Sequence, residues 1–155
     1  MLKAAKYMGV ADAVAALSKD DRIKVGAVLV GPDGDGGPWG YNGAPRGSSK
    51  DDYQHTLTHQ EKKYAFEHAE RNAIYNAARQ GVAIKGWTLV VTHPPCAECA
   101  RAIIQAGIET VIYRKPASDP AKRLSDSWAE SVLAARELFA ECGVLVREVE
   151  DTGTL

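Results

Sequence analysis

The size, charge and cysteine content of the chain set broad limits on its class. A chain of 155 residues can bury one core without cross-links, so we expect a single domain over residues 1–155. The 19 Lys and Arg residues against 20 Asp and Glu give a formal net charge of −1, which disfavours a long nucleic acid as partner. The three cysteines do not form the even, dispersed set of a secreted disulfide framework, and no apolar run approaches the length of a membrane span. These features predict a cytoplasmic protein without a membrane segment.

The first part of the chain is expected to contain a helix, two strands and a long polar segment. Apolar residues recur at helical spacing over residues 1–17, and Lys6 and Asp12 interrupt them, which favours an amphipathic helix over a signal peptide. The apolar run at residues 25–30 predicts a strand, and a second short strand is expected at residues 39–41 after a Gly- and Pro-rich turn. Residues 42–63 are polar and should form an exposed excursion of the kind that is often functional.

The rest of the chain alternates helices with strands. A helical pattern over residues 64–80 ends at Gly81, a strand follows at residues 87–92, and the next helix is expected over residues 96–105. A strand at residues 111–113, a loop at 115–126, a helix at 128–141 and a strand at 144–149 complete the pattern. Strands separated by helices predict a three-layer α/β/α fold around one mixed sheet of about five strands.

Four residues in two motifs carry recognisable chemistry. His68-Ala69-Glu70 opens one expected helix, and Pro95-Cys96-Ala97-Glu98-Cys99 opens the next. One imidazole and two thiolates supply three ligands for a tetrahedral Zn²⁺, and catalytic zinc sites leave the fourth position to water. The first turn of a helix also favours thiolate over thiol. Glu70 is placed to carry protons rather than to bind the metal. The joint pattern matches the H-x-E and P-C-x-x-C signature of zinc-dependent nucleobase deaminases and predicts one Zn²⁺ per chain.

Each of these residues has a simpler explanation when it is taken alone. A Cys-x-x-Cys can be a redox motif, a single His on a helix is usually structural, and Glu70 could be a solvated surface carboxylate. The order and spacing of the two motifs together weaken these explanations. Cys142, expected at the end of a helix, is the only spare cysteine for a fourth ligand. His55 and His59 suggest a second, structural zinc, but histidines in a polar loop are more often simply exposed.

Longer stretches resemble one family. Residues 68–74 resemble the HAE-containing helix of deoxycytidylate (dCMP) deaminases, in which leucine is common at the position of Arg71, and residues 95–108 are similar to their second zinc-ligand helix. Residues 40–47 resemble the glycine-rich loop of dCMP deaminases rather than that of nucleoside or tRNA deaminases. The resemblance covers nearly the whole chain. It implies the cytidine-deaminase-like fold and the hydrolysis of dCMP to dUMP and ammonia, in which water attacks C4 of cytosine and Glu70 moves the protons.

The resemblance also implies residues that bind the substrate. Asn42 matches an asparagine that touches the sugar or the base in related deaminases, and Ala69 matches a position whose backbone N–H faces the pyrimidine carbonyl. For Ala69, ordinary helix packing is the simpler explanation. The 5′-phosphate of a nucleotide needs a cation, for which Arg22 and Lys24 are the nearest candidates in the sequence. Either cation could equally be a solvated loop charge.

Assembly and regulation follow from the resemblance alone. Members of the family are often hexamers and are often regulated by dCTP and dTTP, so a homo-oligomer is expected here. Such effectors would bring Mg²⁺ with them. Arg46 and Arg79 are the candidate effector-binding residues. This control is not universal in the family.

Other functions stay open at this point. The substrate could be a 5-modified dCMP, guanine or tRNA adenosine, although the near-neutral charge counts against tRNA. From a different class, the chain could be a catalytically silent zinc-binding module. Glu70 counts against that reading, because a purely structural site has no use for a proton carrier.

Overall fold

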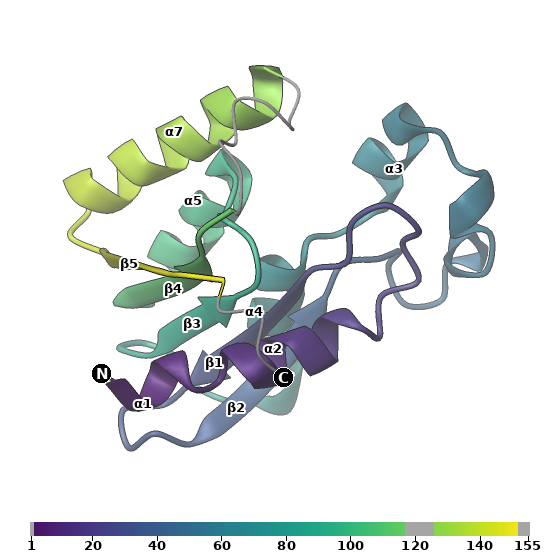
Figure 1. The fold of residues 1–155 in the computed structure, drawn as a ribbon. Coiled ribbons are helices and arrows are strands. Elements are labelled where there is room, and N and C mark those ends of the chain that lie inside the picture. Colours follow the sequence, from purple (N-terminus) through teal and green to yellow (C-terminus); the bar gives the residue numbers. More distant parts are fainter. Residues whose placement is uncertain (1, 117–125, 152–155) are drawn as a thin grey trace.

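The computed structural model describes residues 2–116 and 126–151, which form a sheet with helices on both faces (Figure 1). The sheet contains β1 (Gly26–Val30), β2 (Gly36–Tyr41), β3 (Thr88–Val91), β4 (Thr110–Arg114) and β5 (Leu145–Val149). Its strand order is β2-β1-β3-β4-β5. β1 runs antiparallel to β2 and to β3, whereas β3, β4 and β5 are parallel to one another. The predicted mixed, five-stranded sheet is therefore confirmed.

The two faces of the sheet carry separate halves of the core. The first face packs against α1 (Leu2–Ala5) and α2 (Met8–Ala15), and the second against α4 (Ala69–Gln80), α5 (Ala97–Gln105) and α7 (Asp126–Glu141). Successive residues of a strand point to opposite faces, so Val28 packs toward α2 and Leu29 toward the other layer. This alternation produces the expected α/β/α layers. None of the described helices is long and apolar enough to cross a membrane.

Two glycines allow helices to lie directly on the strands. A Cβ atom on Gly26 would lie 2.0 Å from the carbonyl oxygen of Ala11 in α2. A Cβ atom on Gly40 would lie 2.4 Å from the backbone nitrogen of Ala73 and 2.6 Å from the carbonyl oxygen of Ala69, both in α4. Since backbone atoms cannot move aside as flexible side chains do, only glycine fits at these positions. The contact at Gly40 fixes the first turn of α4 against β2.

The segment between β2 and α4 differs most from the expectation. It contains two short 3₁₀ turns, η1 (Ser49–Asp51) and η2 (Gln54–Thr56), and the helix α3 (His59–Ala65). We call residues 43–66 the lobe, because Figure 1 shows α3 and its neighbours standing apart from the sheet. α3 begins with a capping box in which Thr58 and Glu61 satisfy each other's backbone N–H groups. This Thr-x-x-Glu signal was present in the sequence.

The single helix expected over residues 64–80 is wrong at its beginning. α3 ends at Ala65 and α4 begins at Ala69. Between them the backbone of Glu67 pairs with that of Gly43 in both directions, at N···O distances of 2.8 and 3.1 Å. A chain held in this bridge cannot continue as a helix. The N-terminal helix is likewise divided, into α1 and α2, and most of the loop expected at residues 115–126 lies outside the described residues.

Candidate active site

Three potential metal ligands meet where the first turns of α4 and α5 adjoin. His68 is the N-cap residue of α4, Cys96 is the N-cap residue of α5, and Cys99 lies in the first turn of α5. The Nδ1 atom of His68 is 3.5 Å from Sγ of Cys96 and 3.4 Å from Sγ of Cys99. The three ligand atoms lie within 4.8 Å of one another, and no other group of this kind occurs in residues 2–116 and 126–151. His55 and His59 are exposed and outside it.

The distances in this group fit a tetrahedral zinc ion. With Zn–N bonds of about 2.0 Å and Zn–S bonds of about 2.3 Å, tetrahedral angles separate an N and an S ligand by about 3.5 Å. The observed separations of 3.4 and 3.5 Å agree with this value. Cys142 is exposed after the end of α7 and does not belong to the group. Among the described residues the site therefore offers three protein ligands, the number that catalytic zinc sites use.

The pKa values of the two cysteine thiols also favour a bound cation. A hydrogen bond from Cys99 lowers the pKa of Cys96 to about 4, and His68 adds to this effect. The same bond, together with burial, raises the pKa of Cys99, because a second thiolate beside the first would be repelled. The bond to Cys96 raises the pKa of His68. A divalent cation would remove this conflict, since it allows both sulfurs to be deprotonated.

Glu70 lies beside the ligand group in the first turn of α4. Its side chain is buried, at 4% exposure, and burial raises the pKa of its carboxyl, with His68 opposing the effect. A carboxyl with a raised pKa can hold and release a proton near neutral pH. Ala69, between His68 and Glu70, is fully buried at the first helical position of α4, where backbone N–H groups have no partner within the helix. A contact of this N–H with substrate stays a prediction.

An ion-pair network adjoins the ligands and was not anticipated from the sequence. The guanidinium of Arg71 pairs with Glu67, the residue before His68, and with Glu98, which lies between the two cysteines. The Glu67 and Arg71 pair has the (i, i+4) spacing that a sequence can suggest. The link to Glu98 joins residues 27 positions apart and depends on how α4 and α5 pack.

A half-buried histidine also escaped notice. His93 follows β3, and its Nδ1 lies 2.9 Å from the hydroxyl oxygen of Thr92. That oxygen accepts the backbone N–H of Gly26, so the hydroxyl hydrogen is available to Nδ1. Burial lowers the pKa of His93, the charge of Arg114 lowers it further, and Asp12 opposes the shift. No sequence signal distinguished this residue from any other histidine.

Asn42, directly after β2, contacts the segment before β1 that carries two other candidate substrate-binding residues, Arg22 and Lys24. Oδ1 of Asn42 accepts the backbone N–H of Val25, and its Nδ2 donates to the carbonyl of Ile23, each at 2.8 Å. Asn42 thus fixes the segment that presents Arg22 and Lys24, both of which are exposed. In the part of the chain that the structure describes, neither cation pairs with a carboxylate. A direct contact of Asn42 with substrate stays a prediction.

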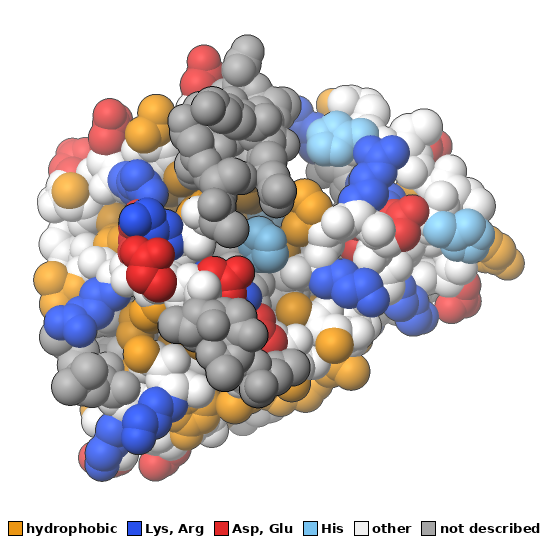
Figure 2. All heavy atoms as spheres, viewed as in Figure 1, with side chains coloured by type: hydrophobic (Ala, Val, Ile, Leu, Met, Phe, Trp, Pro, Cys, Tyr) orange, Lys and Arg blue, Asp and Glu red, His pale blue; other side chains and the backbone are white. Residues whose placement is uncertain are grey.

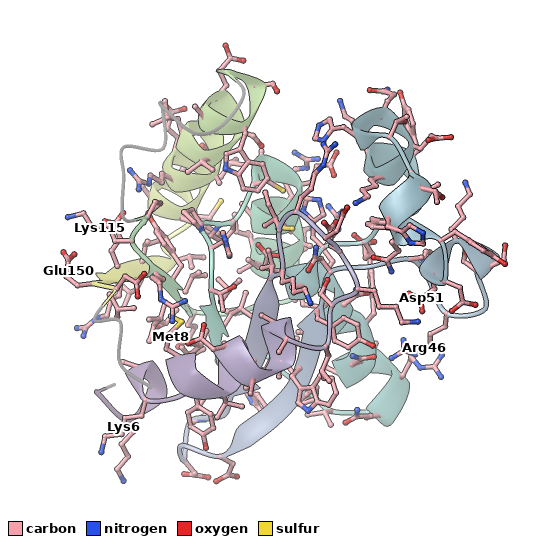
Figure 3. All side chains as sticks on the ribbon, turned by 45° about the vertical axis from the view of Figure 1, so that its right-hand side comes forward. Lys6, Met8, Arg46, Asp51, Lys115 and Glu150 are labelled. Atoms are coloured by element: carbon pink, nitrogen blue, oxygen red, sulfur yellow. The ribbon has the colours of Figure 1, made fainter. Side chains whose placement is uncertain are left out.

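The candidate effector residues lie on the outer side of the lobe and of α4. Nη2 of Arg46 donates to Oδ1 of Asn76 in α4 at 2.6 Å, and Arg79 is exposed one turn further along that helix. Figure 3 shows Arg46 and Asp51 on the outlying side of the molecule, far from Lys6. Figure 2, drawn in the view of Figure 1, shows Lys and Arg side chains at both the left and the right of the molecule. The effector role of Arg46 and Arg79 stays a prediction.

Known proteins with related sequences and structures identify the family. Residues 1–115 match the cytidine and deoxycytidylate deaminase zinc-binding region. The chain belongs to this family. It is 38% identical to human deoxycytidylate deaminase over 148 residues, covering 92% of this chain and 76% of the human protein. It also resembles the crystal structure of dCMP deaminase from the cyanophage S-TIM5 in complex with dCMP and dUMP, with a TM-score of 0.71 and 29% identity over 93% of this chain and 94% of that one. Together with the His-Cys-Cys group, the family identifies a zinc-dependent deaminase.

Proposed function

We propose that the chain hydrolyses dCMP to dUMP and ammonia, with His68, Cys96 and Cys99 as the zinc ligands and Glu70 as the proton carrier. The observation that carries the proposal is the buried His-Cys-Cys group with a buried carboxyl beside it. The substrate is inferred from the deoxycytidylate deaminases at 38% identity and from the structural relative solved with dCMP and dUMP.

Glu70 accounts for both proton transfers that the reaction needs. A zinc ion held by His68, Cys96 and Cys99 would lower the pKa of a bound water to near 7 and so make it a nucleophile at neutral pH. As the oxygen of water forms its bond to C4, the Glu70 carboxylate takes one proton and delivers it to N3 of the base. It then takes the second proton and delivers it to N4, so that the C4–N4 bond breaks and ammonia leaves. The buried position that raises the pKa of Glu70 suits a group that must be protonated between these steps.

The segment before β1 supports recognition of a 5′-phosphate. The neighbouring lysines are already occupied, because Lys19 pairs with Asp51 and Asp52 in the lobe, and Lys62 pairs with Asp20 and Asp21. Arg22 and Lys24 are the cations of this segment that pair with no carboxylate among the described residues, and they are the proposed phosphate contacts. A charge-assisted hydrogen bond to phosphate would favour the nucleotide over the nucleoside by about 10²-fold in kcat/KM.

The experiment is a metal analysis combined with a substrate panel. We expect one zinc per chain and release of ammonia from dCMP, with deoxycytidine about 10²-fold poorer in kcat/KM. The panel also contains cytidine, 5-methyl-dCMP, guanine and a tRNA anticodon hairpin. Equal efficiency on dCMP and deoxycytidine would move the assignment to a nucleoside deaminase, and activity only on guanine or the hairpin would move it to those bases. Bound zinc without any deamination would indicate a silent zinc module.

The double variant Arg22→Gln with Lys24→Gln tests the phosphate contacts. We expect kcat/KM for dCMP to fall about 10-fold or more, because a charge-assisted hydrogen bond contributes about 1.5–3 kcal/mol. The value for deoxycytidine should not change. Lys63→Gln is the matched control, because Lys63 is an exposed cation on α3. An equal loss on both substrates would show that the two cations do not read the phosphate.

We further propose that residues 1–155 form one deaminase domain, because a single sheet organises the core on both of its faces. A cytoplasmic location, a homo-oligomer with a hexamer favoured, and control by dCTP or dTTP with Mg²⁺ stay predictions from the family resemblance. Analytical ultracentrifugation of the protein with and without these nucleotides and Mg²⁺ measures the last two.

A further inference from the structure

Arg71 connects the two segments that carry the metal ligands. Its side chain is 15% exposed and extends from the first turn of α4 back toward the beginning of that helix. Its Nε and Nη2 atoms both reach Oε1 of Glu67, and its Nη1 donates to Oε2 of Glu98 at 3.0 Å. Among residues 2–116 and 126–151, no other ion pair joins α4 to α5. The guanidinium therefore spans the junction at which the ligands meet.

The contact with Glu67 bears on the position of His68. The same oxygen that Arg71 holds, Oε1 of Glu67, accepts the backbone N–H of His68 at 2.9 Å. The backbone of Glu67 is held on its other side by the two hydrogen bonds to Gly43. Both the main chain and the side chain of Glu67 are thus fixed immediately before the imidazole ligand. Arg71 keeps the carboxylate in the orientation that serves this role.

The contact with Glu98 bears on the two cysteines. Glu98 lies between Cys96 and Cys99 in the first turn of α5, and its Oε2 accepts the hydrogen bond from Nη1 of Arg71. The guanidinium of an arginine stays charged over the whole pH range in which proteins fold. Arg71 is therefore a permanent cation beside a centre whose own groups become anionic when they bind metal.

We propose that Arg71 is a positioning residue for the metal centre, which holds the His68 segment and the first turn of α5 at the separation that zinc requires. This inference rests on the proposed function only for the identity of the metal. Arg71 acts through Glu67 and Glu98 and does not itself bind zinc. Its loss lowers zinc affinity, as loss of partners behind metal ligands does elsewhere, by about 10- to 100-fold.

Three variants separate the charge of Arg71 from its geometry. Arg71→Met removes the charge and the bonds but keeps an unbranched chain that favours helix. Arg71→Lys keeps the charge without the planar fork that reaches two carboxylates at once. Glu98→Gln removes one partner on a side chain that is 64% exposed, so it should not disturb folding. Arg101→Met is the matched control, because Arg101 is an exposed cation on α5 whose side chain pairs with no carboxylate among the described residues.

The measurement is the Kd for zinc by chelator competition, together with the visible absorption of the Co²⁺-substituted protein, which reports thiolate ligation and tetrahedral geometry. Arg71→Met should raise the Kd about 10-fold or more and alter the spectrum. Arg71→Lys and Glu98→Gln should raise it by less, and Arg101→Met should leave it within about twofold of wild type. Thermal unfolding without metal shows whether Arg71→Met folds. If it does not, the inference is tested by comparing the Kd for zinc of Glu98→Gln with that of Arg101→Met.

Wild-type zinc affinity and spectrum in both Arg71→Met and Glu98→Gln would overturn the inference. An equal loss in Arg101→Met would also overturn it, because the effect would then be a general response to lost charge. The affinity is measured without substrate. A wild-type protein that binds zinc but does not deaminate dCMP would therefore refute the proposed function. The zinc affinities of the Arg71 variants would still test the inference about Arg71.

Discussion

The metal centre and the lobe are held in place by different forces. The centre lies on two helix N-termini, with Cys99 and Ala69 fully buried and α4 seated directly on β2 at Gly40. The lobe is tied to the body by the backbone bridge at its ends and by polar contacts such as Lys19 with Asp51. Exposed ion pairs contribute about 0–1 kcal/mol each and are screened by salt, whereas a misfit in a packed core costs about 1–3 kcal/mol. The fold therefore packs the metal centre tightly, whereas the lobe depends more on polar contacts with the body.

The largest effect should come from the carboxyl at the centre. Glu70→Gln should lower kcat by about 10² to 10⁴, because an amide cannot carry the protons between water, N3 and N4. Zinc content should be unchanged. The melting temperature should not fall, because burial already disfavours the charged form of this carboxyl.

The matched control for Glu70→Gln is Glu109→Gln, which removes an exposed carboxylate before β4 and should keep full activity. Steady-state kinetics, elemental analysis and thermal unfolding of both variants separate chemistry from folding. A Glu70→Gln protein with near-normal turnover would refute the assignment of this residue as the proton carrier.

A pair of glycine substitutions tests whether the metal centre is packed more tightly than the lobe. A methyl group on Gly40 would collide with the backbone of α4, and we expect Gly40→Ala to lower the free energy of unfolding by about 1–3 kcal/mol. A methyl group on Gly43, at the beginning of the lobe, would meet its nearest atom, Nε2 of Gln54, at 3.5 Å, an ordinary contact. Gly43→Ala should therefore change that free energy by no more than about 0.5 kcal/mol.

Urea denaturation with a comparison of midpoints at constant slope measures both glycine variants. Equal losses would mean that the lobe is packed as tightly as the centre, and the contrast between the two regions would fail. A Gly40→Ala protein of wild-type stability would mean that α4 can move away from β2 at little cost.

The residues at the centre were predictable because their chemistry is local in the sequence. His68 with Glu70, and Cys96 with Cys99, each lie within one helical turn, and the alternation of strands and helices indicated that the two segments would approach. The break between α3 and α4 was missed because it depends on Glu67 pairing with Gly43, a contact that spans 24 positions and leaves no periodicity. The link from Arg71 to Glu98 was missed for the same reason, since helical spacing does not report contacts between different helices.

The smallest effect should come from His93, at the carboxyl end of β3. Burial, followed by the charge of Arg114, lowers its pKa in the folded chain, while Asp12 opposes the shift. Below its ordinary pKa of about 6.5 the unfolded chain then binds more protons at this position than the folded chain does. The stability that His93 contributes is complete above that pH and is lost as the pH falls through the lowered pKa. His93→Asn keeps a group that can accept the Thr92 hydroxyl and removes the titration.

Between pH 6.5 and 5 the free energy of unfolding should fall more steeply for wild type than for His93→Asn. The difference in slope is at most that of one proton, about 1.4 kcal/mol per pH unit. Urea titrations of both proteins without zinc, at several pH values, give this difference, and the contributions of His68 and of the thiols cancel because both proteins contain them. His55→Asn is the control, because it makes the same exchange of residue types at an exposed position in the lobe. Parallel curves for wild type and His93→Asn would show that the folded environment does not lower the pKa of His93, and would contradict this prediction.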